Sequence, residues 1–141
     1  LNAAFSIMTT SDRRLSPSRY RFARNSDVTT TPVTRLEGRS ESQPREPGDA
    51  LSVKELMTGQ DATLLEFRRA KGLVDPNHAH PDHESICYLV SGRVRVVIDG
   101  EEFIAEPGDA WIHPAGIPHF HETLEDSVQI EIKAPPTRTW D

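Results

Sequence analysis

Three things are scarce in this sequence of 141 residues, and each scarcity excludes a class of protein. With one cysteine, Cys87, the chain cannot form an internal disulfide, which is typical of a reducing compartment. No apolar run approaches the roughly 20 residues that a membrane-spanning helix needs. Positive charge is also scarce: the formal net charge is −6, whereas a dedicated nucleic-acid binder usually carries a basic surface. No basic segment followed by an apolar stretch marks a secretory signal, so we expect a cytoplasmic protein.

The chain divides into two parts of different charge. Residues 1–48 hold eight arginines against five acidic residues and are rich in Ser, Thr and Pro, whereas residues 49–141 hold eight basic and seventeen acidic residues. A segment with the first composition cannot bury enough apolar surface to fold alone. We therefore expect an irregular N-terminal extension over 1–48, flexible or draped over one folded domain at 49–141.

From residue 50 onward the pattern is that of β-strands. Short alternating runs recur, separated every eight to twelve residues by turn signals, which is the spacing of a β-sandwich or barrel. The strongest signal is Asp99–Gly100, because an Asp-Gly pair between apolar strands favours a type I′ hairpin. Ser91–Gly92 and 107–109 are interpreted as turns in the same way. The expected strands are 51–57, 62–70, 86–90, 94–98, 102–105, 110–113, 119–123 and 128–133, so the fold class is all-β.

The six histidines all lie between His78 and His121, and four of them form two His-x-His pairs. Residues i and i+2 of a strand point to the same face, so His78 with His80, and His119 with His121, present two pairs of imidazoles. If the two segments are neighbouring antiparallel strands, the four side chains form a square on one inner face. Imidazole ligands of this kind suit a divalent transition metal.

The residues around these pairs resemble the two motifs of the cupin family. In the first, five residues separate Gly72 from His78-Ala-His80, and Gly92 closes the motif. In the second, five residues separate Gly108 from a Pro-Ala-Gly-Ile-Pro-His segment that ends at His119. The resemblance covers residues 51–133. It implies a cupin double-stranded β-helix, that is, a jelly-roll barrel, with one divalent ion bound by the motif histidines His78, His80 and His119.

The sequence departs from the family at the fourth ligand. The cupin motif has a glutamate six residues before its closing glycine, and counting back from Gly92 places Ser85 there, with Glu84 one residue away. A one-residue slip turns a strand side chain to the opposite face, so we expect Ser85 inward and Glu84 outward. A bulge after Pro81 would reverse this. We predict His121 as the fourth metal ligand; the alternative is a buried histidine beside the site.

The remaining candidates are interpreted as structural. His83 precedes a strand and is expected at the barrel mouth or surface, and His113 at a strand end is expected to be structural or at the rim. Cys87 lies in an apolar run without a feature that would activate a thiol, so we expect it to be buried and inert. The metal ion is expected to be the main catalyst, so no catalytic residue is predicted. Ser85 and Glu84 are the candidates for an assisting role.

An ion held by imidazoles alone keeps its full +2 charge, which favours polarising a carbonyl group. We therefore expect a metal-dependent, non-redox enzyme that acts on a small organic carbonyl substrate. Small single-domain cupins include aromatic polyketide cyclases and uronate-handling enzymes. The resemblance to that group implies a cyclase or isomerase, with a polyketide cyclase as the first hypothesis. A non-haem iron dioxygenase and a non-catalytic ligand-binding cupin are the alternatives.

The expected cofactor is one divalent ion, with zinc first and iron, nickel or manganese as alternatives. The expected partners are a small-molecule substrate and a second copy of the chain, with no nucleic acid and no membrane. We expect a homodimer because the exposed edge strands of a short sandwich must be paired or covered. Residues 20–48 are long enough to reach a neighbouring copy.

Overall fold

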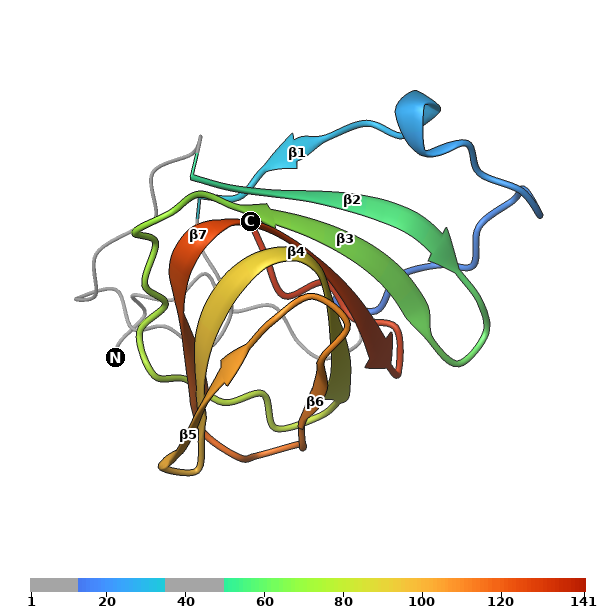
Figure 1. The fold of residues 1–141 in the computed structure, drawn as a ribbon. Coiled ribbons are helices and arrows are strands. Elements are labelled where there is room, and N and C mark those ends of the chain that lie inside the picture. Colours follow the sequence, from blue (N-terminus) through green and yellow to red (C-terminus); the bar gives the residue numbers. More distant parts are fainter. Residues whose placement is uncertain (1–12, 35–49) are drawn as a thin grey trace.

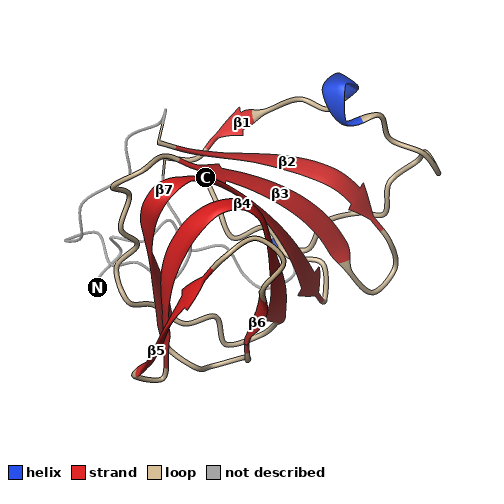
Figure 2. Cartoon of the chain, in the orientation of Figure 1, coloured by secondary structure: helices blue, strands red, loops and turns tan. Residues whose placement is uncertain are grey.

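A computed structural model describes residues 13–34 and 50–141. The described chain is built almost entirely of strands, as Figure 2 shows. A short 3₁₀ turn, η1 (Asn25–Asp27), precedes them. The strands are β1 (Thr31–Pro32), β2 (Leu51–Thr58), β3 (Thr63–Arg69), β4 (Glu84–Ile98), β5 (Glu101–Ala105), β6 (Ala110–His113) and β7 (His119–Ala134). The prediction of an all-β protein is confirmed.

The strands form one antiparallel sheet in the order β1-β2-β3-β7-β4-β5, and β6 pairs with β4. β4 and β7 are the longest strands, and Figure 1 shows how both arch so that the sheet curls into a barrel. The two arched strands pair along almost their whole length, from Glu84 opposite Ala134 to Ile98 opposite His119. Their shared inner face therefore lines the centre of the barrel.

Two expected breaks between strands are wrong, and one of them is the turn predicted at Ser91–Gly92. Residues 86–90 and 94–98 belong to the single strand β4, and residues 119–123 and 128–133 belong to the single strand β7. Gly92 is an irregularity of the pairing rather than a chain reversal, because the register shifts around it and the strand continues. Its φ is 92°, and a Cβ at this position would clash with Ser127. A glycine that permits a bulge and a glycine that permits a turn give the same sequence signal.

The hairpin predicted at Asp99–Gly100 is confirmed. Both residues have positive φ, 51° for Asp99 and 81° for Gly100, as a type I′ turn requires. This tight turn connects β4 to β5, which pair from Ile98 opposite Glu101 onward. The hairpin therefore closes one end of the barrel wall.

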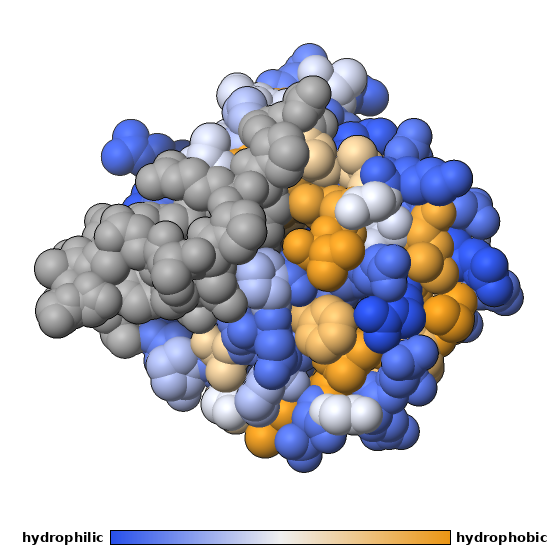
Figure 3. Space-filling model, turned by 90° about the vertical axis from the view of Figure 1, so that its left-hand side faces the viewer, coloured by the Kyte–Doolittle hydropathy of each residue, from blue (hydrophilic) through white to orange (hydrophobic). Residues whose placement is uncertain are grey.

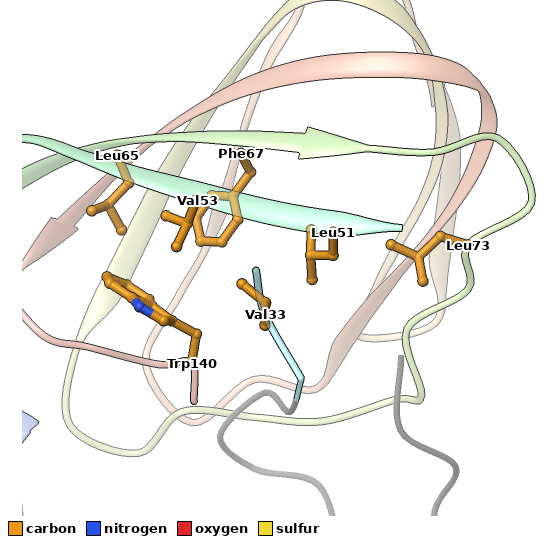
Figure 4. Packing of buried hydrophobic residues seen from close by; sticks show 7 residues of the cluster. All are labelled: Val33, Leu51, Val53, Leu65, Phe67, Leu73 and Trp140. Carbon is orange, nitrogen blue, oxygen red and sulfur yellow. The ribbon is translucent and has the colours of Figure 1, made fainter. Parts of the chain in front are cut away.

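The apolar core consists of two clusters. The first joins β2 and β3 to residues from both ends of the described chain, and Figure 4 shows Trp140 and Val33 packing against the strand side chains. Its buried members are Val33, Leu51, Val53, Leu65, Phe67, Leu73 and Trp140. The second lies between β4, β5 and β6 and contains Cys87, Leu89, Val94, Val96, Ala105 and Trp111.

The described part of the N-terminal extension lies against the barrel. β1 pairs with the edge strand β2, and the guanidinium of Arg13 donates to the carbonyls of Arg138 and Trp140 in the C-terminal tail. The rest of the extension, residues 1–12 and 35–48, lies outside the described residues. No helix in the described segments is long and apolar enough to cross a bilayer.

Candidate metal centre

The two His-x-His segments are neighbours, as predicted. His78 lies in the loop before β4, and His119 is the first residue of β7. They form an isolated antiparallel bridge in which the amide of His78 donates to the carbonyl of His119 at 3.0 Å and the reverse bond is 2.8 Å. The backbone thus holds the two segments together at one point inside the barrel.

Three histidines converge at this bridge. One ring nitrogen from each of His78, His80 and His119 lies within 4.8 Å of the other two. The side chains are buried, with exposed fractions of 8%, 5% and 2%, and their ring centroids are 4.5–5.3 Å apart. We call these three residues the open triad.

Backbone carbonyls orient two of the rings. Nδ1 of His78 donates to the carbonyl of Pro76 at 2.8 Å, and Nδ1 of His119 donates to the carbonyl of Ile117 at 3.1 Å. Each acceptor lies two residues before its histidine. With the proton on Nδ1, the lone pair of Nε2 is available to a metal, which is the usual arrangement of a histidine ligand and its outer hydrogen bond.

Burial keeps the triad neutral. It lowers the pKa of His78 and that of His119, the latter to about 3, and it places the pKa of His80 well below the usual value. For His80, the positive charge of Lys133 and then the other triad rings lower the pKa further, and for His119 the ring of His78 does so, because one positive charge disfavours a second one nearby. Three neutral, convergent imidazoles are a donor set that fits a divalent ion such as zinc, iron, nickel or manganese.

Ser85 occupies the position of the usual carboxylate ligand, as the count back from Gly92 predicts. Ser85 is buried and Glu84 is exposed, because side chains alternate along β4. The Oγ of Ser85 accepts a hydrogen bond from Lys133 Nζ at 2.8 Å, and Lys133 in turn lies 3.1 Å from Glu131. The side chain at this position is therefore a buried serine that is hydrogen-bonded to an ammonium group.

His121 does not complete a square with the triad. In an antiparallel pair, two residues forward on one strand correspond to two residues backward on the other. Because His78 faces His119, His80 and His121 project toward opposite ends of the pair. In the square expected from the sequence, His78 faces His121. In the structure, His78 faces His119 instead.

His121 instead belongs to a second group of histidines, which we call the closed pair, His113 and His121. Nδ1 of His121 lies 2.7 Å from Asp75 Oδ2, and its Nε2 lies 3.2 Å from Nε2 of His113. His113 also accepts from the indole of Trp111 at 3.1 Å and faces the sulfur of Cys87 at 3.9 Å. Both ring nitrogens of each histidine already have a protein partner.

A buried ion pair anchors the closed pair. The guanidinium of Arg69 lies 2.6 Å from Asp75 Oδ1. Burial alone would raise the pKa of Asp75, but Arg69 and the hydrogen bond with His121 outweigh it and hold the pKa well below its usual value. Asp75 is therefore a carboxylate fixed between two partners.

The prediction that His83 lies at the mouth or surface is wrong. Its side chain is 3% exposed and its ring stacks on that of His80 with centroids 4.7 Å apart. Nδ1 of His83 lies 2.9 Å from Asp82, and burial lowers its pKa to about 4. His83 lies two residues before Ser85 and therefore points to the same face if the chain is extended there. Continuing the alternation of β4 back past its first residue would have predicted His83 to be inward.

A second trio could also hold a metal by distance alone. Cys87, His113 and Glu131 have ligand atoms within 4.8 Å of one another. However, Glu131 already pairs with Lys133 and accepts from Gln129 at 2.7 Å. The thiol of Cys87 is fully buried, as predicted, and burial raises its pKa well above the usual value. Glu131 is therefore engaged by other side chains, and Cys87 is held as a neutral thiol.

The cavity around the histidines is small and polar. Its volume is about 30 Å³, close to the share of one water molecule in liquid water. Two ion pairs line it, Arg69 with Asp75 and Lys133 with Glu131, alongside the triad and the closed pair. Sequence reasoning missed all four charged residues, because no motif spacing connects them.

This arrangement places the chain among the β-barrel proteins whose inner face carries convergent imidazoles that could hold a metal ion. The sequence profile of the cupin domain matches residues 65–132. The pectin degradation protein KdgF of Dickeya dadantii is 33% identical over 91 residues, which cover 64% of this chain and 83% of that protein. The chain belongs to the cupin family.

Solved structures of cupins have the same fold. KdgF from Halomonas sp. is 27% identical, with a TM-score of 0.66 over 81% of this chain and 94% of that one. The polyketide cyclase RemF from Streptomyces resistomycificus is 21% identical, with a TM-score of 0.63 over 85% of this chain and 84% of that one. At this identity the likeness to RemF shows the fold alone.

Proposed function

We propose that the open triad binds one divalent metal ion and that the protein is a metal-dependent, non-redox enzyme acting on a small organic carbonyl substrate. The observation that carries the proposal is the donor set: three neutral imidazoles converge, and the usual carboxylate position holds Ser85 instead. His121 is left out of the ligand set because its nitrogens face Asp75 and His113.

Ligand charge supports non-redox chemistry. A carboxylate ligand would reduce the effective charge of the ion, and neutral imidazoles do not. The bound ion would act as a Lewis acid on a substrate oxygen. Glu84 points to solvent, and the usual carboxylate position holds Ser85, which accepts a hydrogen bond from Lys133. This position therefore does not supply the carboxylate on which the dioxygenase alternative rests.

The polarity of the cavity indicates the substrate class. Two buried ion pairs line it, and they suit an oxygen-rich compound that can hydrogen-bond to charged groups rather than a flat aromatic polyketide. The relative with 33% identity is a pectin degradation protein, which favours a sugar acid. We therefore place isomerisation of a sugar acid ahead of the polyketide cyclisation expected from the sequence.

Lys133 and Glu131 are the residues proposed to act on the substrate. The ammonium group of Lys133 can donate a hydrogen bond to a substrate oxygen in place of Ser85 Oγ, which is 2.8 Å away. Burial raises the pKa of Glu131, but Lys133, His121 and Arg69 outweigh burial and lower it. Glu131 is therefore a carboxylate that can accept a proton next to the triad, as isomerisation requires.

The substrate must displace part of the cavity wall, since about 30 Å³ admits no organic molecule. Thr139 of the C-terminal tail lines this cavity, and its neighbour Trp140 lines a hollow of about 720 Å³ beside the N-terminal arm. The tail therefore contacts both spaces. We propose movement of residues 137–141 as the route of entry.

Metal content and turnover test the proposal. Purified protein should contain about one divalent ion per chain, and it should convert a carbonyl compound from a panel of pectin-derived sugar acids and poly-β-ketones without consuming oxygen. Oxygen-dependent turnover with iron would support the dioxygenase. Stoichiometric metal with no turnover of either panel would support a ligand-binding cupin. Protein that takes up no divalent ion would contradict the metal site itself.

A further inference from the structure

The histidine cavity is closed to solvent in this structure. None of the six histidines is more than 8% exposed, and a volume of about 30 Å³ holds little more than one water molecule. A hydrated metal ion or an organic substrate can therefore reach the open triad only when some element of the structure moves. The contacts around the cavity indicate which element this is.

The barrel wall itself is a poor entrance. β7 pairs with β3 on one side and with β4 on the other, so opening the wall there breaks a ladder of backbone hydrogen bonds. On the side of β5, Figure 3 shows hydrophilic and hydrophobic side chains interleaved and packed against one another outside the part drawn in grey. β5 is itself paired with β4 along its whole length. An element outside the sheet can move at lower cost.

Residues 137–141, which we call the tail, are such an element. β7 ends at Ala134, so the tail belongs to none of the strands of the sheet. Thr139 of the tail is 3% exposed and lines the histidine cavity. Its neighbour Trp140 packs edge-on against Phe67 with ring centroids 6.1 Å apart (Figure 4), and Phe67 lines the same cavity. Separation of the tail from the barrel would therefore remove one wall of the cavity.

The N-terminal extension holds the tail in place. Two backbone hydrogen bonds, of 2.8 and 3.0 Å, flank an antiparallel bridge between Arg14 and Thr137. The side chain of Arg14 also donates to Thr137 Oγ1 at 2.6 Å. Further along, the amide of Thr34 donates to the carbonyl of Asp141 at 2.8 Å. The extension thus supplies the tail with the kind of backbone partners that neighbouring strands supply elsewhere in the fold.

Arg13 makes the most buried of these contacts. Its guanidinium is 5% exposed and lies 3.3 Å from the carboxylate of Asp141. It also donates to the carbonyls of Arg138 at 3.4 Å and Trp140 at 3.3 Å. Loss of these partners would leave a buried charge uncompensated, so Arg13 favours the closed position of the tail. The three distances lie at or beyond the long end of the hydrogen-bond range, which keeps separation of the tail accessible.

We propose that residues 13–15 of the extension act as a latch, which holds the tail over the histidine cavity and so regulates access to the open triad. This inference rests on the proposed function and adds to it the residues that keep the entrance closed. Trp140 also lines the hollow of about 720 Å³ beside the extension, so an open tail would join that hollow to the cavity.

A latch changes rates rather than affinity. If metal enters and leaves only through the open form, the fraction of open protein scales both the association and the dissociation rate by the same factor. The dissociation constant, which is their ratio, then stays the same. A residue with a merely structural role in the triad would change the dissociation constant instead.

A disulfide across the latch tests the proposal directly. In an antiparallel pair that is flanked by its hydrogen bonds, the Cα atoms lie roughly 4.5 Å apart, which a disulfide can span. The variant carries Arg14→Cys together with Thr137→Cys. Its oxidised form should bind and release zinc at least about tenfold more slowly than the same protein reduced with a phosphine, at an equal dissociation constant. Stopped-flow measurements with a zinc indicator give both rates, and equal rates in the two forms overturn the proposal.

Chemical modification of the metal-free protein gives a second test. Diethyl pyrocarbonate modifies neutral imidazoles that it can reach, and mass spectrometry locates the modified histidines. Arg13→Met should raise the rate of modification on the order of tenfold, because it removes charge-assisted hydrogen bonds of the closed tail. Arg21→Met is the matched control, because Arg21 is exposed on the same extension and its loss removes the same charge. Unchanged modification in Arg13→Met, or an equal rise in Arg21→Met, overturns the proposal.

Cys87 separates opening of the tail from unfolding of the barrel. Its thiol is 0% exposed and lies in the core between β4, β5 and β6. It should stay unreactive toward Ellman's reagent in Arg13→Met while the histidines are modified. If the thiol reacts as fast as the histidines, the whole barrel opens and the latch is refuted.

The two tests also separate failure of the latch from failure of the proposed function. Protein that takes up no zinc in either form of the disulfide variant contradicts the metal site, and histidine modification then decides on the latch alone. Normal zinc binding with equal rates in both forms contradicts the latch and leaves the metal site standing.

Discussion

The open triad and the closed pair are two groups of buried histidines in one cavity, and they differ in what their ring nitrogens contact. In the triad, His78 and His119 donate from Nδ1 to backbone carbonyls, and one nitrogen of each ring lies close to one nitrogen of each other triad ring. In the pair, both nitrogens of His121 face other side chains, namely Asp75 and His113. Burial and closeness are common to both groups, so neither property identifies a ligand. The kind of partner separates them: Nδ1 of His78 and Nδ1 of His119 donate to backbone carbonyls, whereas both nitrogens of His121 face side chains.

The triad should fail first when one of its members is removed. His80→Ala should lower metal affinity by at least about 100-fold, because loss of an outer-shell partner alone costs 10–100-fold and a ligand contributes more. Equilibrium dialysis with zinc measures the affinity, and circular dichroism should show unchanged β structure. Full metal retention in the single alanine variants of His78, His80 and His119 would refute the triad as the binding site.

The closed pair should matter for stability rather than for metal. Asp75→Asn leaves the guanidinium of Arg69 buried without its charged partner, 2.6 Å away, which costs roughly 3–5 kcal/mol of unfolding free energy. The control is Glu102→Gln, which breaks the exposed pair with Arg95 and should cost less than about 1 kcal/mol. Urea unfolding measures both. If folded Asp75→Asn protein lost the metal bound by the triad, the open triad and the closed pair would act as one site, which contradicts this distinction.

Acid should lower the stability of the metal-free protein. Burial lowers the folded-state pKa of His119 to about 3 and that of His83 to about 4, whereas both titrate near 6.5 when unfolded. The unfolded chain then binds more protons below pH 6.5, so the stability of the metal-free protein falls as pH drops from there toward 4. Urea midpoints at pH 7, 6 and 5 measure this. Equal midpoints would show that these histidines are not held neutral.

His83→Phe sharpens the same measurement. It keeps an aromatic ring stacked on His80 but removes one titrating group, so the midpoints should fall less steeply with pH than in the parent protein. If the urea midpoint of the variant fell as steeply with pH as that of the parent, His83 would not contribute to the pH dependence. Its ring would then be in contact with water, although its centroid lies 4.7 Å from that of His80.

The smallest effects are expected at the two residues that compete for the fourth position. Glu84→Ala removes an exposed side chain and should leave zinc affinity within about twofold of the parent. His121→Ala should weaken it by less than about tenfold, because His121 hydrogen-bonds to Asp75 and His113 rather than to a residue of the triad, and so is not an outer-shell partner of a ligand. Isothermal titration measures both. A larger loss for Glu84→Ala would mean that β4 shifts its register when metal binds.

Strand parity made part of the site predictable. Alternation counted from Gly92 placed Ser85 inward and Glu84 outward, and the structure confirms both. Parity is local, since it depends only on the extended backbone of one strand. The same rule correctly turned both His119 and His121 inward. It could not say which residue of the other segment each one faces.

Strand β7 shows a second limit of prediction from the sequence pattern. Residues 128–133 alternate cleanly, and the usual expectation places the apolar face in the core. In the structure Gln129, Glu131 and Lys133 are buried, while Ile132 is 40% exposed. A periodic pattern defines two faces but does not assign them, because the assignment depends on what each face meets.

By itself, the sequence determined the all-β class, the hairpin at Asp99–Gly100 and the three histidines of the triad, since each follows from local geometry or from a motif. Only the tertiary structure decided that β4 and β7 are continuous, that His78 faces His119, that His83 is buried, and that four charged residues line the cavity. The physical reason is that register and the choice of inner face come from pairing between distant segments. Local patterns cannot encode that pairing, because the same alternation is compatible with several registers.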